Sequence, residues 1–137
     1  MNRNDYCIIE KALYNDAHGF DGDRVNALCY SPEGVLYVGA GYGLFFYEDG
    51  VFVKIVGIID SVDALCCLPG NTVLAVSGRD VYVVENNIIT GRKPLPEDVF
   101  PGKRINGISV DPARREAWLC SDDGMVKMTF CLPPNKD

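Results

Sequence analysis

Short apolar runs alternate with turn-forming residues along most of the chain, and three groups of these runs resemble one another. The run VNALC at residues 25–29 returns as VDALC at residues 62–66 and, more loosely, as INGIS at residues 105–109. A turn containing proline follows each of these runs, and proline presets the backbone angle that a tight turn needs. Recurrence at intervals of about 40 residues indicates a repeat architecture.

Each unit continues with further segments that favour β-strands. The first two units add a fourth segment after Asp49-Gly50 and Asn86-Asn87, dipeptides that are typical of β-hairpins. No segment shows a long apolar period of 3.6 residues with helix caps, so we expect little helix. The second strands are predicted at 35–38, 73–76 and 117–120, the third at 44–47, 81–84 and 125–128, and the fourth at 51–56 and 88–90.

Four short strands in a unit of about 40 residues predict the blade of a β-propeller. A β-sandwich also uses short strands, but it has no reason to repeat its turns in register. We therefore expect an all-β fold, a β-propeller segment of about three four-stranded antiparallel blades that forms an incomplete ring. The expected organisation is a spare outer strand at 6–14, blade units at 25–56, 62–90 and 105–130, a long loop at 91–104 and a tail at 131–137.

The first unit, at residues 25–47, resembles the propeller repeat of two-component-regulator sensors. That repeat usually carries an aspartate where Ser31 stands and a tryptophan where Tyr37 stands. The third unit has Asp111 and Trp118 at these two positions. What the resemblance implies is a scaffold or sensor propeller, with no catalytic residues to carry over.

Two turn segments, SPEG at 31–34 and SDDGMVK at 121–127, are also similar to WD40 blades, although the Trp-Asp pair that names that family is absent. Propellers usually have four to eight blades, so about three blades leave the ring open. Either the chain is a piece of a longer propeller, or copies of it associate to close the ring. We expect the apolar segment 6–13 to complete a third-unit blade, in the same arc or in a partner's, or to belong to a preceding blade.

The formal net charge of -6 decides which partners to expect. Nucleic acids and anionic membranes attract clustered lysine and arginine, so we expect neither as a partner. The composition, 47% hydrophobic and 23% charged, is that of a folded domain. Because no signal peptide and no long apolar run is recognisable, we expect a soluble cytoplasmic protein whose partner is another protein, a second copy or the remaining blades of a longer chain.

The chain has six cysteines, and most of them lie within apolar, strand-like runs. For a cytoplasmic protein we expect reduced thiols that pack as small apolar side chains, rather than disulfides. Cys66 and Cys67 are adjacent and should point to opposite faces of one strand. The ligand spacing of a zinc site is absent, so we expect no metal and no cofactor.

Asn26, Asp63 and Asn106 occupy one position in the three units, at the start of the first strand. The first strand of a propeller blade lines the central channel, so these side chains could form a partial ring that binds Ca²⁺ or a small ligand. Alternatively, each could cap a local turn. The run GAGYG at 39–43 lacks the spacing and the helix of a nucleotide-binding loop and favours a hairpin.

Function in propellers is displayed on the loops that connect strands and blades. The connector at 91–102, which contains three prolines, is the longest, and the alternative is that it only links two blades. We expect a non-catalytic interaction module and not an enzyme; the alternative is a small-ligand or Ca²⁺-binding sensor, or a hydrolytic propeller, that uses the channel residues. The candidate interaction residues are Tyr42, Arg92, Lys93, Lys103 and Arg104.

Overall fold

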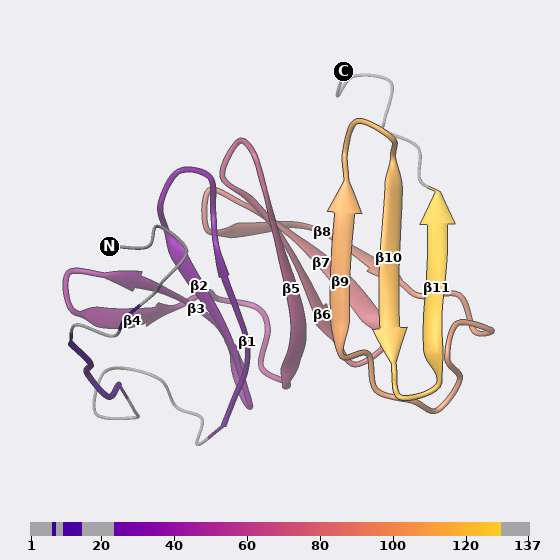
Figure 1. Cartoon of the computed structure of the whole chain (residues 1–137), viewed down its shortest axis with the longest axis horizontal. Helices are drawn as coiled ribbons and strands as arrows, with labels where there is room; N and C mark the ends of the chain where they lie inside the picture. Colours follow the sequence, from indigo (N-terminus) through magenta and orange to yellow (C-terminus); the bar gives the residue numbers. More distant parts are fainter. Residues whose placement is uncertain (1–6, 8–9, 15–23, 130–137) are drawn as a thin grey trace.

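The computed structural model describes residues 7, 10–14 and 24–129, and in these residues it contains β-strands and no helix. The strands form three antiparallel sheets that lie side by side (Figure 1). Sheet 1 consists of β1 (Val25–Tyr30), β2 (Leu36–Ala40), β3 (Gly43–Glu48) and β4 (Val51–Lys54). Sheet 2 consists of β5 (Val62–Leu68), β6 (Thr72–Ser77), β7 (Asp80–Glu85) and β8 (Ile88–Pro94). Sheet 3 consists of β9 (Gly107–Asp111), β10 (Glu116–Ser121) and β11 (Gly124–Thr129).

Each strand pairs with the strand that follows it in its own sheet, so every sheet is a simple meander. The first strands of the sheets lie next to one another, β1 beside β5 and β5 beside β9. This is the arrangement of an incomplete propeller, in which the first strand of each blade is innermost. The predicted all-β fold is therefore confirmed.

The sequence repeat is also a repeat of strand register. In sheet 1 the pairing of β1 with β2 shifts between Val25 and Ala27, and in sheet 2 the pairing of β5 with β6 shifts between Val62 and Ala64. Each shift is a β-bulge, which leaves one residue of the first strand out of the ladder. The bulges match, and this fixes which residues of the two sheets are equivalent.

Hairpin turns follow the predicted chemistry. Asn86 and Asn87 both have positive φ, at 51° and 67°, which is the signature of the two-residue turn whose twist suits a hairpin. The GAGYG run is a hairpin as expected, because β2 ends at Ala40 and β3 begins at Gly43. Gly43 has a φ of 144°, and a Cβ there would lie 2.7 Å from the carbonyl oxygen of Ile58. Only glycine fits this turn without strain.

Two apolar clusters join the three sheets. The first packs Tyr37 and Leu44 of sheet 1 against Val73 and Tyr82 of sheet 2. The second joins sheets 2 and 3, and its buried members are Ala64, Val76, Leu95, Ile105 and Leu119. We call the face of sheet 1 that carries Leu28, and the equivalent face of each of the other two sheets, the front face; the opposite face is the back face. The back face of each sheet packs on the front face of the next sheet.

The end of β8 and the segment before sheet 1 differ from what the sequence predicts. β8 continues to Pro94, past the strand that the sequence suggests. In the expected spare strand, Cys7 and residues 10–14 are not in a strand, and the ring of Tyr14 contacts Tyr47 and Phe52 of sheet 1. The rest of that segment and the tail at 131–137 lie outside the described residues. Within the described part of the chain, no helix is long and apolar enough to cross a membrane.

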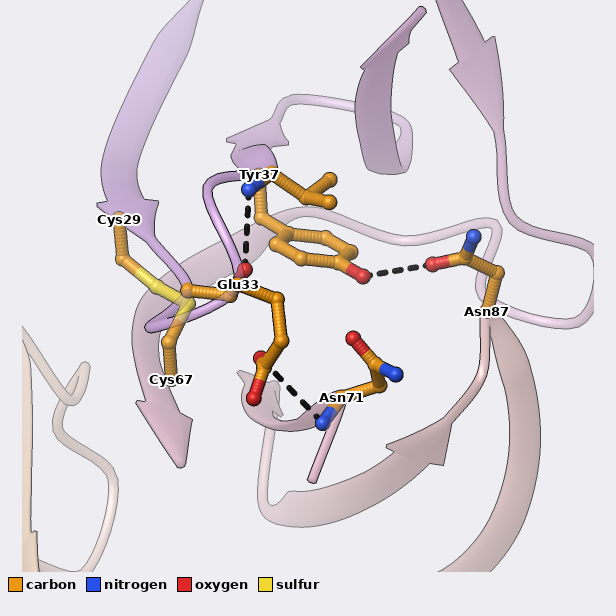
Figure 2. The surroundings of a disulfide bond; sticks show 8 residues. Cys29, Glu33, Tyr37, Cys67, Asn71 and Asn87 are labelled. Carbon is orange, nitrogen blue, oxygen red and sulfur yellow. Dashed lines mark hydrogen bonds between the residues drawn. A yellow bond between two sulfur atoms is a disulfide. The ribbon is translucent and has the colours of Figure 1, made fainter. Parts of the chain in front are cut away.

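The expectation of reduced thiols is wrong for one pair, because Cys29 and Cys67 form a disulfide (Figure 2). Cys29 lies on the back face of sheet 1 and Cys67 on the front face of sheet 2, and their Cα atoms are 6.3 Å apart. That separation is within the range that a disulfide can span. Cys66 takes the opposite face of β5, as predicted, where the backbone of Val110 in sheet 3 contacts its thiol.

Candidate functional site

The residues selected from the sequence lie mainly at one edge of the three sheets, which we call the rim. The rim consists of the β2–β3 turn at 41–42, the β6–β7 turn at 78–79, the β10–β11 turn at 122–123 and the connectors at 55–61 and 95–106. It is the lower edge of the molecule in Figure 1. The two bulges also lie at this edge, since β1 and β5 begin there.

Asn26 and Asp63 are linked through Ser61. The Asn26 Nδ2 atom donates to Ser61 Oγ at 2.9 Å and to the Val62 carbonyl oxygen at 3.2 Å. Ser61 Oγ in turn donates to Asp63 Oδ1 at 2.9 Å. Because Asn26 and Asp63 occupy the bulges, their side chains are turned out of the strand ladder toward the junction of sheets 1 and 2.

Asp63 also pairs with Arg104, a candidate interaction residue from the connector to sheet 3. Arg104 Nη2 lies 2.8 Å from Asp63 Oδ1, and the exposed fractions of the two side chains are 50% and 11%. The guanidinium thus neutralises the one carboxylate among the three predicted channel residues. Among the residues that the structure describes, no group of three or more His, Cys, Asp or Glu side chains could hold a metal ion.

Within the described residues, no side-chain hydrogen bond joins Asn106 to Asn26 or Asp63. Its Nδ2 atom donates to Asp122 Oδ1 at 3.0 Å, within its own sheet. The rim therefore contains two polar groups, one that links sheets 1 and 2 to Arg104, and one confined to sheet 3. Sequence reasoning missed Ser61, which stands directly before the second repeat and whose role depends on a partner 35 residues away.

The connector between sheets 2 and 3 is held in a defined conformation. Arg79 donates from Nη1 to the Phe100 carbonyl oxygen at 3.1 Å and from Nη2 to the Pro96 carbonyl oxygen at 2.9 Å. Two side chains of the connector itself, those of Leu95 and Val99, are buried. Backbone hydrogen bonds close its two turns, from Val99 to Pro96 and from Lys103 to Phe100.

The remaining candidate residues are exposed at the rim or beside it. Tyr42 lies in the β2–β3 turn and is 55% exposed. Lys103 Nζ is 3.9 Å from Asp123 Oδ2, a weak surface pair. Arg92 and Lys93 lie on β8, and Arg92 is occupied within its own sheet, since its Nη2 atom is 2.6 Å from Asp80 Oδ2.

The opposite edge of the molecule fastens sheet 1 to sheet 2 (Figure 2). There Glu33 accepts hydrogen bonds from the backbone amides of Gly70, at 3.1 Å, and Asn71, at 3.4 Å. The buried Tyr37 donates its hydroxyl to Asn87 Oδ1 at 2.6 Å, and burial raises the pKa of that hydroxyl. These contacts and the disulfide join the two sheets as one unit.

The front face of sheet 1 is a second candidate surface. It holds an open pocket of about 440 Å³. The pocket is lined mostly by apolar and aromatic side chains: Ala12, Tyr14, Val25, Leu28, Tyr30, Leu36, Val38, Tyr47 and Phe52. An exposed apolar surface on the first sheet of an incomplete propeller is a place where another apolar face can pack.

Comparisons with known proteins add no family to this picture. No protein-family model matches the sequence, and no curated protein is similar to it.

Proposed function

We propose that the chain is a non-catalytic interaction module of the β-propeller type that binds a protein partner through the rim. In this proposal the three sheets belong to a ring, completed by the remaining blades of a longer chain or by self-association. The partner contacts the turn that carries Tyr42 and the connector that carries Lys103 and Arg104. The two kinds of propeller repeat that the sequence resembles are consistent with this role, since both belong to scaffold or sensor proteins.

The observation that carries this proposal is the way Arg79 holds the connector. A loop that only links two sheets has no need of two side-chain hydrogen bonds to its backbone and a buried Leu95 and Val99. A loop already ordered before binding loses less conformational entropy when a partner docks. Lys103 and Arg104, each about half exposed and each beside an aspartate, then give such a partner hydrogen-bond donors in defined positions.

A Ca²⁺ or small-ligand site at the channel residues is less well supported. Asp63 Oδ1 already accepts a hydrogen bond from Ser61 and forms an ion pair with the Arg104 guanidinium, so a cation would have to displace that guanidinium. Calcium sites use six to eight oxygen ligands, several of them from carboxylates. Calorimetric titration of the chain with Ca²⁺ should give no binding heat; saturable heat that disappears in Asp63→Ala would favour the sensor.

The proposal is tested by comparing the proteins that three forms of the chain retain from extracts of its source cell. The rim variant combines Tyr42→Ala with Lys103→Ala, both at exposed positions. The control is Arg114→Ala, which also removes one exposed positive charge but lies in the β9–β10 turn at the opposite edge. We expect a partner that the wild type and the control retain and that the rim variant retains at least about tenfold less.

Quantitative mass spectrometry of the retained proteins is the measurement. If the rim variant and the wild type retain the same proteins in the same amounts, the rim is not the binding surface. Each variant should first show the unfolding midpoint of the wild type, so that lost binding reports a lost contact.

A further inference from the structure

On each terminal sheet, some of the positions that are buried between sheets elsewhere in the molecule are exposed. Matching strand registers place Leu28 of β1 at the position of Leu65 in β5. Leu65 is 8% exposed because its face packs on sheet 1, whereas Leu28 is 63% exposed. Val25 repeats the pattern, since its equivalents Val62 and Ile105 are buried and it is half exposed. The inner strand of the front face therefore has the apolar pattern of an inter-sheet contact, while Val38, Ala40 and Phe45, farther out on the same face, are already buried.

The back face of sheet 3 is open in the same way. By register, Trp118 of β10 stands where Tyr37 stands in β2, and Met125 of β11 stands where Leu44 stands in β3. Tyr37 is 2% and Leu44 0% exposed in the contact with sheet 2. Trp118 is 44% and Met125 71% exposed. The largest apolar side chains of this face thus have no sheet packed over them in the described part of the chain.

The exposed face of sheet 1 is a front face, and the exposed face of sheet 3 is a back face. Within the chain, a back face already packs on a front face in two places. Sheet 1 meets sheet 2 in this orientation, and sheet 2 meets sheet 3 likewise. A second copy of the chain therefore offers the complementary half of each open face. Contact of this head-to-tail kind either closes into a ring or continues as an open polymer.

We infer that the front face of sheet 1 binds the back face of sheet 3 in a second copy of this chain, and that two chains close into a ring of six sheets. This inference depends on the propeller arrangement of the proposed function, but not on the rim. Six sheets fall within the four to eight blades that propellers contain, and three copies would exceed them. Two identical contacts then form at once and cover the exposed part of both faces in each chain.

The pocket on the front face of sheet 1 marks the centre of the contact between the two copies. Tyr14 covers the outer strands of the front face by packing against Tyr47 and Phe52, while Leu28 and Tyr30 on the inner strand stay exposed. The pocket of about 440 Å³ between them is large enough for an aromatic side chain. On the back face of sheet 3 that side chain is Trp118, and buried tryptophans commonly dominate the energetics of protein contacts.

Light scattering on a gel-filtration column tests the inference, with single substitutions that put a charge on one face at a time. Leu28→Arg blocks the front face and Met125→Arg blocks the back face, and both side chains are mostly exposed in the single chain. Val56→Arg is the control, because Val56 is exposed in the β4–β5 connector, outside both faces. We expect the wild type and the control at twice the chain mass of 15.1 kDa, and each blocked variant at the chain mass.

Mixing the two blocked variants gives the sharper result. The intact back face of Leu28→Arg can still bind the intact front face of Met125→Arg, so the mixture should form dimers through a single contact. Because the ring has two contacts and this dimer has one, its dissociation midpoint should lie at a concentration at least about tenfold higher. Dimers in the mixture but in neither variant alone would establish the head-to-tail contact.

Two outcomes overturn the inference. A wild-type monomer at all concentrations means that no second copy binds, and the ring is then completed by other blades, of a longer chain or of another polypeptide. A dimer that Leu28→Arg abolishes and Met125→Arg preserves means that two front faces meet each other. Tyr30→Arg provides a second front-face variant if Leu28→Arg fails to fold. Neither outcome affects the rim, whose binding is read from Tyr42 and Lys103.

Discussion

The disulfide between Cys29 and Cys67 gives the most direct quantitative prediction, because it ties together the first strands of two sheets. The bond closes a chain segment with a sequence separation of 38 residues. Loop closure of that length lowers the entropy of the unfolded chain by about 13 cal/mol/K, which corresponds to about 4 kcal/mol at 25 °C. We expect reduction to lower the free energy of unfolding by about that amount.

The native sheets should stay together after reduction, so the change falls mainly on the unfolded state. Asn26 still donates to Ser61, and the Glu33 carboxylate still accepts from the Gly70 and Asn71 amides. Two thiols occupy the same space as the disulfide, so no cavity opens. With an m-value of about 2 kcal/mol/M, the urea midpoint should fall by roughly 2 M.

The assay is urea unfolding of the wild type with and without a thiol reductant. The double variant Cys29→Ala/Cys67→Ala should behave like the reduced wild type and lose its response to the reductant. Cys66→Ala is the matched control and should keep that response, since Cys66 is on the other face of β5. Unfolded, unreduced protein should contain two fewer reactive thiols than reduced protein. Equal thiol numbers, or equal midpoints with and without reductant, would refute the reasoning.

Two further substitutions test the turn and the buried tyrosine. Gly43→Ala should destabilise the protein by roughly 1–3 kcal/mol, because its Cβ would meet the Ile58 carbonyl, while Gly41→Ala, with nothing within 4 Å, should be close to neutral in the same urea assay. Tyr37→Phe should lower the free energy of unfolding by about 1 kcal/mol at neutral pH, through loss of the hydrogen bond to Asn87. Burial raises the pKa of Tyr37, so the folded state favours the neutral phenol, and its stabilisation is present below pH 10 and lost as the pH rises through the folded pKa. Unfolding measured at pH 8 and pH 11 should show a smaller loss in Tyr37→Phe than in the wild type; an equal loss would contradict this.

The sequence predicted the features that depend on local chemistry. Asn86-Asn87 and Asp49-Gly50 specify hairpins through their own backbone preferences, and the recurrence of similar turns indicated sheets in series. The spacing of the glycines in GAGYG and the apolar, strand-like run that follows it at 44–47, in place of a helix, separated a hairpin from a nucleotide-binding loop. Such features need no knowledge of distant partners.

The features that the sequence did not predict depend on which faces meet. Repeat alignment matches Cys29 to Cys66, and the disulfide instead uses Cys67, whose side chain points to the other face of β5. The channel residues likewise share a repeat position, but Asn106 lacks the Ser61 link that joins Asn26 to Asp63. Asn106 finds Asp122 in its own sheet, whereas Asp63 receives Arg104 from the next connector.

The contact between sheets 1 and 2 contains more specific interactions than the contact between sheets 2 and 3, and this difference affects the stability of a closed ring. Sheets 1 and 2 share a disulfide, the Glu33 contacts and the Tyr37 hydroxyl bond. Among the described residues, sheet 3 is joined to sheet 2 by an apolar cluster and by the contact of the Cys66 thiol with the Val110 backbone, while Arg79 and Arg104 hold only the connector that leads into sheet 3. In a two-chain ring, sheet 3 would also pack on the partner's sheet 1, so its position would be fixed from both sides. Self-association would then stabilise sheet 3 most, because the single chain holds that sheet least firmly. The connector that carries Lys103 and Arg104 leads directly into sheet 3.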